Sequence, residues 1–224
     1  MPTAFTPRLN VLPGAQRRLW AELAQTPEHF TLYGGTAIAL RLGHRQSADF
    51  DFFSPRLFEP RLLLETISYL KGAEILRSAA NDLTVTVDRD GPVQLSFFGN
   101  FDLGQVAPAE PVQGPQFNVA ALLDVAGMKV AVVTQRAEPK DYLDIHALLT
   151  KANISLATML AAAAIIYGSE FNPLLSLKAI SYFGDRSLGD LPPDLRRDLI
   201  EAVRTTDPHN RPVIEAIRQR GAKR

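Results

Sequence analysis

Hydrophobic and polar positions follow two different periods in the first half of the chain. A helical period predicts helices over residues 13–25, 36–42 and 59–71. A period of two, or a short aromatic run bounded by turn residues, predicts strands over residues 30–33, 48–53, 73–78, 83–87 and 93–98. Gly43 and Gly72 follow two of the predicted helices, where a C-terminal cap is expected. This half of the chain therefore combines strands with helices.

The second half of the chain shows the helical period alone. Asn118, Ser155 and Asn172 are predicted N-caps, because their side-chain oxygens can accept from the first backbone amides of a helix. Pro139 and Pro173 stand where the first turn of a helix tolerates proline. We therefore expect this half to be built from helices.

A segment without any period separates the two halves. Residues 99–118 are rich in Gly, Pro and Gln, so we interpret them as a connection. The expected fold class is α+β, with a small mixed sheet flanked by helices and followed by a helical C-terminal region. The predicted domains are residues 1–115, an α/β domain, and residues 116–224, a helical domain that closes a cleft.

Composition and charge narrow the classes of function. The 24 Lys and Arg residues balance the 24 Asp and Glu residues, so the formal net charge is zero. A partner held mainly by charge, such as bulk nucleic acid or an anionic membrane, is therefore not indicated. The sequence contains no cysteine, which excludes disulfide scaffolds, thiolate zinc sites and cysteine nucleophiles.

The distribution of apolar residues also bears on location. No run approaches about 18 apolar residues, so no membrane span is expected. Residues 1–8 lack the basic start and apolar run of a signal peptide, which favours a cytoplasmic protein. Four basic residues near the C-terminus are candidates either for RNA contact or for a solvated tail: Arg218, Arg220, Lys223 and Arg224.

The turn between the first predicted strand and the helix after it contains Gly34, Gly35 and Thr36. Two glycines at this position let the backbone approach a ligand closely. The first amides and the positive dipole end of the helix would then point at an anion such as phosphate. A tight turn that needs a positive φ explains the same pair of glycines, and both interpretations stay open at this point.

Two carboxylates lie two residues apart on the next predicted strand. Asp49 and Asp51 would project from one face, about 6.6–6.8 Å apart along the backbone, while Phe50 and Phe52 enter the core from the other. Neighbouring carboxylates repel one another unless a cation lies between them. Mg²⁺ accepts one or two carboxylates and completes its shell with water and phosphate oxygens. The pair therefore predicts a magnesium site, and a solvated acidic strand face is the alternative.

Two cations occur on a predicted helix that is otherwise rich in Ala, Val, Leu and Met. Lys129 and Arg136 are seven residues apart, so we expect them on one helix face. They need an anionic partner, for which a triphosphate is suitable. We expect Asp141 and Asp144 to orient these cations rather than bind metal. The alternative is a solvated helix edge on which Lys140 pairs with Asp144.

The order of these motifs resembles a known family. Gly-Gly-Thr, twelve residues and then Asp-x-Asp on a strand resembles the nucleotidyltransferase fold shared with DNA polymerase β. The run from Tyr33 to Phe53 is similar to the AbiEii/AbiGii toxin family of nucleotidyltransferases. That family's second signature matches Asp124, Lys129, Arg136, Lys140, Asp141 and Asp144. The resemblance covers roughly residues 30–150.

The resemblance implies a Mg²⁺-dependent nucleotidyltransferase that moves a nucleoside monophosphate from an NTP to an acceptor hydroxyl. The acceptor would be a tRNA end or a protein, and the protein would be the toxin of a toxin–antitoxin or phage-defence pair, with an antitoxin protein as a partner. The implied catalytic residues are Asp49, Asp51 and Lys129, of which Asp49 and Asp51 bind the metal. The implied nucleotide contacts are Gly34, Gly35, Thr36, Arg45, Lys129, Arg136 and Asp144.

The sequence departs from this fold's pattern at one position. A third metal carboxylate is usual on a later strand, and the aligned residue is Ser96, whose neutral hydroxyl is a poor Mg²⁺ ligand. Asp88, at the end of the preceding strand, is a candidate substitute. A non-catalytic nucleotide-binding or regulatory protein with the same fold is therefore the alternative function, and a metal-dependent phosphohydrolase is a third.

Overall fold

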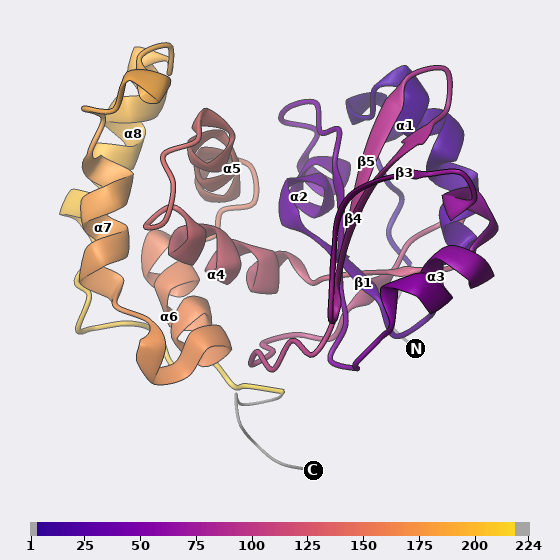
Figure 1. The fold of residues 1–224 in the computed structure, drawn as a ribbon. Coiled ribbons are helices and arrows are strands. Elements are labelled where there is room, and N and C mark those ends of the chain that lie inside the picture. The colour runs from indigo at the N-terminus through magenta and orange to yellow at the C-terminus, as the bar shows by residue number, and fades with distance from the viewer. Residues whose placement is uncertain (1–3, 218–224) are drawn as a thin grey trace. The chain divides into compact units, whose positions relative to one another are not determined.

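The computed structural model describes residues 4–217, so the four C-terminal basic residues named above lie outside the described part. The chain forms two compact units, which Figure 1 shows in indigo to magenta and in rose to yellow. The first unit contains the chain up to Asp102 together with Ala109–Ala120. The second contains Leu103–Pro108 together with the chain from Ala121 onward. The division therefore falls after residue 120, and six residues of the expected connection belong to the helical unit.

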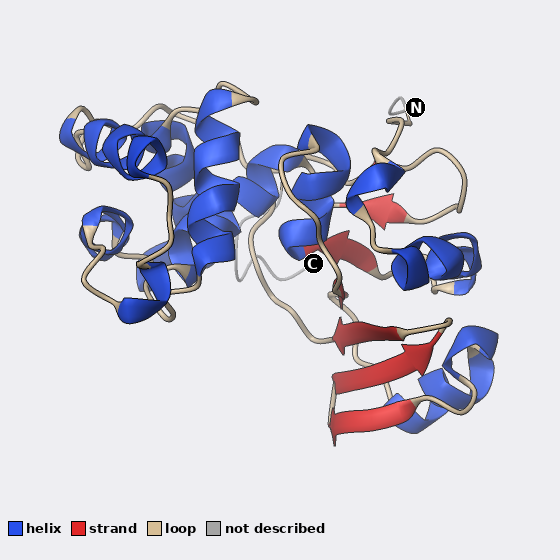
Figure 2. Cartoon of the chain, turned by 90° about the horizontal axis from the view of Figure 1, so that it is seen from above, coloured by secondary structure: helices blue, strands red, loops and turns tan. Residues whose placement is uncertain are grey.

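The first unit is built on a mixed seven-stranded sheet in the order β3-β4-β5-β2-β1-β7-β6. Figure 2 shows its strands in red. The strands are β1 Thr31–Tyr33, β2 Phe50–Phe53, β3 Glu74–Ala79, β4 Asp82–Asp88, β5 Pro92–Phe98, β6 Glu110–Pro111 and β7 Asn118–Val119. The helices are α1 Gly14–Leu19, α2 Gly34–Leu42 and α3 Pro60–Thr66, with short 3₁₀ turns η1 Leu9–Val11, η2 Trp20–Gln25 and η3 Ser68–Leu70. The α+β fold class predicted from the sequence is confirmed.

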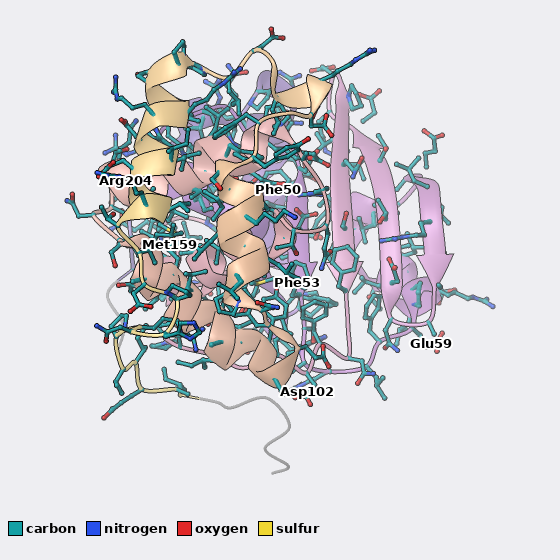
Figure 3. All side chains as sticks on the ribbon, turned by 90° about the vertical axis from the view of Figure 1, so that its left-hand side faces the viewer. Phe50, Phe53, Glu59, Asp102, Met159 and Arg204 are labelled. Atoms are coloured by element: carbon teal, nitrogen blue, oxygen red, sulfur yellow. The ribbon has the colours of Figure 1, made fainter. Side chains whose placement is uncertain are left out.

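One face of the sheet carries the core of the first unit. Phe50 and Phe52, alternate residues of β2, are both completely buried. The ring of Phe52 stacks on that of Phe97 from β5, with ring centroids 5.4 Å apart. Phe50 and Phe53, labelled in Figure 3, begin and end β2. The aromatic run that predicted this strand therefore supplies the packing that holds it at the centre of the sheet.

The opposite face carries polar residues in one row across the strands. Tyr33 of β1 pairs with Asp51 of β2, and Asp51 pairs with Ser96 of β5. Ser96 in turn pairs with Thr84 of β4. Because residues directly opposite one another in a sheet share a face, these four side chains lie on one side. The polar side of this sheet is therefore the side on which Asp51 lies.

The structure corrects three details of the predicted elements. The helix expected over residues 59–71 ends at Thr66, and η3 follows it after Ile67. The helix expected over 13–25 consists of α1 followed by η2. Asn118 does not cap a helix: it lies in β7, where it pairs with Thr31 of β1. A two-residue strand has no period of its own, so only its pairing with β1 reveals it.

The second unit is helical, as predicted. Its helices are α4 Leu122–Val132, α5 Pro139–Thr150, α6 Leu156–Tyr167, α7 Pro173–Ser181 and α8 Pro193–Arg204, with 3₁₀ turns η4 Gly168–Glu170 and η5 Arg186–Leu188. Ser155 and Asn172 are N-caps as expected, because their side chains accept from the amides of Thr158 and Leu174 at 3.1 and 3.0 Å. No helix in the described part of the chain is long and apolar enough to cross a bilayer.

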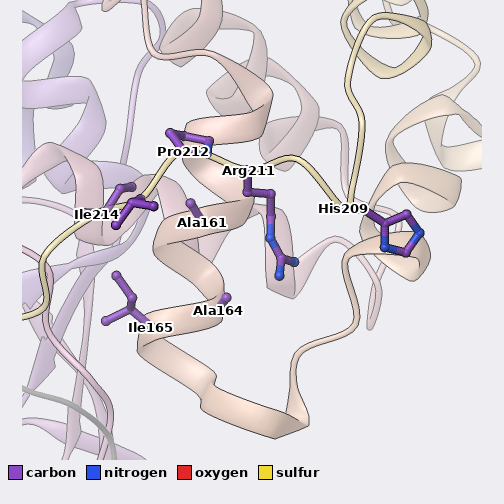
Figure 4. A pocket seen from close by; sticks show the side chains of 8 residues that line it. Ala161, Ala164, Ile165, His209, Arg211, Pro212 and Ile214 are labelled. Carbon is purple, nitrogen blue, oxygen red and sulfur yellow. The ribbon is translucent and has the colours of Figure 1, made fainter.

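Two contacts organise the helical unit. Helices α4 and α6 lie side by side in Figure 1, and a Cβ on Gly127 of α4 would come within 2.8 Å of the backbone nitrogen of Ala163 of α6. In Figure 4, the segment containing Pro212 and Ile214 runs past α6 in an extended conformation and borders a cavity of about 290 Å³. Further along this segment, the Ile217 amide donates to the Gln105 carbonyl at 2.8 Å.

Candidate functional site

The glycine turn and one aspartate of the predicted pair lie in direct contact. Strand β1 ends at Tyr33, and Gly34 begins α2 with a φ of +73°. A Cβ at Gly34 would lie 2.7 Å from Oδ2 of Asp51. Glycine suits this position, because any other residue would need a left-handed backbone and its Cβ would force the Asp51 carboxylate to move. The structure therefore brings the turn and Asp51 together within one unit.

Helix α2 gives this turn its electrostatic character. The helix has nine residues and ends at Gly43, which adopts the left-handed conformation expected of a C-terminal cap. Its first amides, including those of Gly35 and Thr36, belong to the end of the helix that carries partial positive charge. An anion bound at Gly34 would therefore meet both backbone donors and a favourable dipole.

The side chain of Thr36 makes hydrogen bonds inside the protein. Its hydroxyl donates to the backbone carbonyl of Asp49, and it lies 2.7 Å from the hydroxyl of Ser47. Thr36 is buried, so this hydroxyl belongs to the packing between α2 and the loop before β2. Phosphate contact at Thr36 stays a prediction, and its backbone amide in the first turn of α2 is the group that suits it.

Further hydrogen bonds fix the loop that leads to β2. The Ser47 amide donates to the carbonyl of Val11 at 3.0 Å. The side-chain amide of Gln16 donates to the carbonyl of Ala48 at 2.9 Å. Both partners lie more than 30 residues away in the sequence, so no local pattern could have identified them. The half-buried Arg45 belongs to the same loop, and its guanidinium donates to the neighbouring carbonyl of Gln46 at 2.8 Å.

The two aspartates frame the start of β2. Asp51 lies inside the strand, whereas Asp49 directly precedes it, and both are half-buried. Phe50 between them is completely buried, so in an extended chain its two neighbours point away from the core. Among the described residues, no three His, Asp or Glu side chains form a metal cluster. Two carboxylates suit Mg²⁺, which keeps water and substrate oxygens in the rest of its shell.

The position of the usual third carboxylate is occupied by Ser96. It pairs with Asp51 in the parallel register of β2 and β5 and is buried. Asp88 does not replace it. Asp88 lies at the far end of β4, four residues from Thr84, which is about 13 Å along the strand. Its carboxylate accepts from the amide of Gly91 at 2.8 Å, so it stabilises the turn between β4 and β5 instead.

The second motif lies in the helical unit and forms a buried ionic cluster. The ammonium group of Lys129 lies 2.8 Å from a carboxylate oxygen of Asp141 and 2.9 Å from one of Asp144. The guanidinium of Arg136 donates to the other oxygen of Asp141 at 3.0 Å. Asp141 and Asp144 therefore orient the two cations, as expected. Their carboxylates are anionic partners of Lys129 and Arg136 within the protein.

The geometry of this cluster corrects two expectations. Helix α4 ends at Val132, so Arg136 lies beyond it and does not share a helix face with Lys129. Lys140 lies 3.1 Å from Glu138, whereas the carboxylate of Asp144 lies beside Lys129. The cluster is therefore not a solvated helix edge. The side chains of both aspartates are 0% exposed and that of Lys129 is 7% exposed, whereas that of Arg136 is 43% exposed.

Asp124, the first residue of this motif, has a structural role that the sequence did not predict. It is buried in the first turn of α4. Its two carboxylate oxygens accept from the backbone amides of Val106 and Ala107, each at 2.9 Å. Charge-assisted bonds of this kind are stronger than neutral ones. Asp124 therefore holds the segment Leu103–Pro108 against α4.

Comparison with known proteins gives one family. The model of the family described as nucleotidyl transferase AbiEii toxin, type IV toxin–antitoxin system, matches residues 18–220. An uncharacterised protein of Aquifex aeolicus is 31% identical over 124 residues, which are 54% of this chain and 58% of that protein. The chain therefore spans less than two thirds of this relative.

Two solved structures have a similar fold. MenT4, a nucleotidyltransferase toxin of Mycobacterium tuberculosis, matches with a TM-score of 0.61 and 16% identity, covering 86% of this chain and 82% of that one. A putative nucleotidyltransferase from H. pylori matches with a TM-score of 0.55 and 17% identity, covering 85% of this chain and 90% of that one. At this identity the likeness concerns the fold, which is nucleotidyltransferase-like.

Proposed function

Because this chain belongs to the AbiEii family of nucleotidyl transferase toxins from type IV toxin–antitoxin systems, we propose that it moves a nucleoside monophosphate from an NTP to an acceptor hydroxyl. The observation that carries this proposal is the contact between Gly34 and Asp51. It supports the proposal because a glycine backbone suited to a phosphate and a carboxylate suited to a metal then lie side by side in one unit of the protein.

In the proposed reaction, the phosphates lie on the backbone at Gly34 and Gly35, where the amides of α2 donate to their oxygens. Asp49 and Asp51 would hold Mg²⁺, which neutralises charge on the reacting phosphate and on the leaving pyrophosphate. The acceptor oxygen forms a bond to the α-phosphorus as the bond to the β-phosphate bridging oxygen breaks. The proton of the acceptor hydroxyl passes to a carboxylate of the pair, so no covalent intermediate with the protein is needed.

The residues of the second motif are proposed to act in two ways. Lys129 contacts both Asp141 and Asp144 and so holds the two carboxylates together. Arg136 is half exposed, and a guanidinium can contact phosphate through two N–H groups at once. Nucleotide contact by Lys129, Arg136, Asp144 and Arg45 stays a prediction from the family signature.

The partners follow from the family. A type IV toxin implies an NTP substrate and an antitoxin at the family level. A tRNA end or a protein hydroxyl is the proposed acceptor, and a cytoplasmic location is proposed with it. Radiolabelled NTPs, offered one at a time with Mg²⁺ and either total RNA or total protein, identify both the base and the acceptor.

The experiment uses Asp51→Asn as its matched control. We expect label to move to one acceptor class with the wild-type chain and not with the variant. The same transfer by both proteins would contradict the mechanism. Asn keeps the size of the side chain, so a folded variant reports on the lost charge rather than on packing.

One observation favours a second candidate function, a non-catalytic nucleotide-binding or regulatory protein. Ser96 pairs with Asp51 where this fold usually has a third carboxylate. The same experiment separates the two functions, because tight Mg²⁺-dependent NTP binding without transfer of label favours the second. Release of unattached nucleotide in the absence of an acceptor would instead indicate a phosphohydrolase.

A further inference from the structure

The two aspartates of the pair are held in place by different means. Asp51 lies inside β2 and pairs on one side with Tyr33 and on the other with Ser96. Asp49 precedes the first residue of β2, so the sheet does not fix its backbone. The hydroxyl of Thr36 supplies a hydrogen bond to the Asp49 carbonyl instead.

The direction of the hydrogen bonds follows from the chemistry of hydroxyls. A hydroxyl has one proton to donate, and the carbonyl of Asp49 can only accept. The Thr36 hydroxyl therefore donates its hydrogen bond to the Asp49 carbonyl. The Ser47 hydroxyl, 2.7 Å from that of Thr36, must then donate to Thr36. The bonds run from Ser47 through Thr36 to Asp49, and each polarises the next.

The two hydroxyl residues of this chain of hydrogen bonds are each held in place by other parts of the structure. Thr36 and Ser47 are both buried. Thr36 belongs to α2, and the Ser47 amide is held by the carbonyl of Val11 at 3.0 Å. The bonds therefore transmit the position of α2, whose first residue is Gly34, to the backbone of Asp49.

We propose that Thr36, supported by Ser47, is a positioning residue that sets the separation between the Asp49 and Asp51 carboxylates and thereby the affinity of the pair for a divalent cation. The proposal rests on the proposed function, because it assumes that the pair binds a metal. In this role the side-chain hydroxyl of Thr36 acts on the backbone of Asp49. The role is separate from any contact between the backbone amide of Thr36 and a phosphate. Groups that orient metal ligands in this way typically change metal affinity by about 10–100-fold when removed.

The test measures Mn²⁺ binding to the full chain by electron paramagnetic resonance, without nucleotide. Thr36→Val keeps the shape of the side chain and removes the hydroxyl, and we expect it to weaken Mn²⁺ binding about tenfold. Thr36→Ser keeps the hydroxyl and should restore the wild-type affinity. Ser47→Ala should weaken binding in the same direction by less, because it removes only the supporting bond.

A matched control separates positioning from a loss of stability. Thr26 is another buried threonine of the first unit, and its hydroxyl lies 2.7 Å from that of Tyr69. Thr26→Val removes a comparable hydroxyl–hydroxyl hydrogen bond away from the aspartates and should leave Mn²⁺ affinity unchanged. Ser47→Ala keeps the proposal testable if Thr36→Val does not fold, because unchanged Mn²⁺ binding by Ser47→Ala would then contradict it.

The outcomes distinguish this proposal from the proposed function. Wild-type Mn²⁺ affinity in Thr36→Val, together with loss of binding in Asp49→Asn and Asp51→Asn, overturns the positioning role alone. So does a Thr36→Val variant that binds Mn²⁺ normally but loses NTP affinity in EDTA, since this indicates a phosphate contact. A wild-type chain that binds Mn²⁺ no better than the two Asp variants overturns the metal site and the positioning role together.

Discussion

The carboxylate of Asp51 occupies the space into which a side chain on Gly34 would extend, with 2.7 Å between Oδ2 and the position of that Cβ. The two residues are joined by the antiparallel pairing of β1 and β2, in which Asp51 lies opposite Tyr33. The register of β1 and β2 therefore sets how closely Gly34 approaches the Asp51 carboxylate. A substitution at Gly34 tests whether this contact matters.

We expect Gly34→Ala to abolish metal-dependent NTP binding and nucleotidyl transfer, because its Cβ would displace Asp51. The positive φ adds a backbone cost of about 1–2 kcal/mol. Gly72→Ala is the matched control: its φ is +75° and its Cβ would meet nothing within 4 Å. Both variants should lose stability in urea unfolding through the backbone cost, Gly34→Ala more because of its clash with Asp51, and only Gly34→Ala should lose NTP binding by calorimetry. Equal binding by the two would show that the contact with Asp51 is irrelevant.

A substitution at Ser96 can supply the third carboxylate that this fold usually has. Ser96→Asp places a carboxylate beside Asp51 on the neighbouring strand, so we expect a lower melting temperature without metal and a larger rise on adding Mg²⁺ than in wild type. Thr84→Asp is the control, since it lies in the same row one strand further from Asp51. Thermal scans with and without Mg²⁺ measure both effects. A Mg²⁺ response as large in Thr84→Asp would count against a site at Asp51.

We expect Lys129→Met to destabilise the helical unit by about 3–5 kcal/mol, because it removes the buried ammonium group that contacts the carboxylates of both Asp141 and Asp144. Arg136→Gln should cost less than about 1 kcal/mol, since its side chain is half exposed. Urea unfolding followed by circular dichroism gives both values. A Lys129→Met chain as stable as wild type would mean that this cluster does not contribute to folding.

Gly127 should also be intolerant of substitution, because α4 and α6 pack closely at this residue. A Cβ at this position would meet the backbone of Ala162 and Ala163 at 2.9 and 2.8 Å, so Gly127→Ala should force α4 and α6 apart at a cost of about 1–3 kcal/mol. Gly14→Ala, in helix α1, would approach only the flexible end of Arg18 and should be neutral or stabilising. Chemical unfolding of the two variants compares them directly, and equal stabilities would refute the close packing.

The ion pair of Glu22 with Arg89 predicts a pH dependence of stability. The Arg89 guanidinium donates to both carboxylate oxygens of Glu22 at 2.7 and 2.8 Å and holds the pKa of that carboxyl below its ordinary value of 4.5. A lowered pKa stabilises the fold above the unfolded-state value, and this contribution disappears as the pH falls through the folded-state value. Its size should be below about 1 kcal/mol, because both groups are partly exposed.

The measurement compares wild type with Glu22→Gln. The difference in unfolding free energy should be present at about pH 7 and should shrink as the pH falls through the lowered folded-state pKa of Glu22, below which Glu22 is protonated in both states. A difference that persists at low pH would mean that Glu22 stabilises the fold through packing rather than through its charge.

Some features of the candidate site could be identified from local sequence motifs, and others depend on contacts between residues far apart in the chain. The Gly-Gly-Thr turn and the Asp-x-Asp pair are short motifs, so their residue types and spacing identified them directly. The role of Thr36 could not be identified in this way, because its partners Ser47 and Asp49 become neighbours only when α2 packs against the loop before β2. The same holds for Asp88, a candidate from the sequence that only the strand register removed from the site.

The sequence by itself determined strands β1 to β5, most helices and the family, because each depends on residues close together in the chain. The tertiary structure decided the partners of the charges: Lys129 and Arg136 meet Asp141, and Asp124 meets the backbone of Val106. Side-chain periodicity reports which face of an element is buried. It does not report which element packs against that face, and in this protein that choice determines what each charged residue binds.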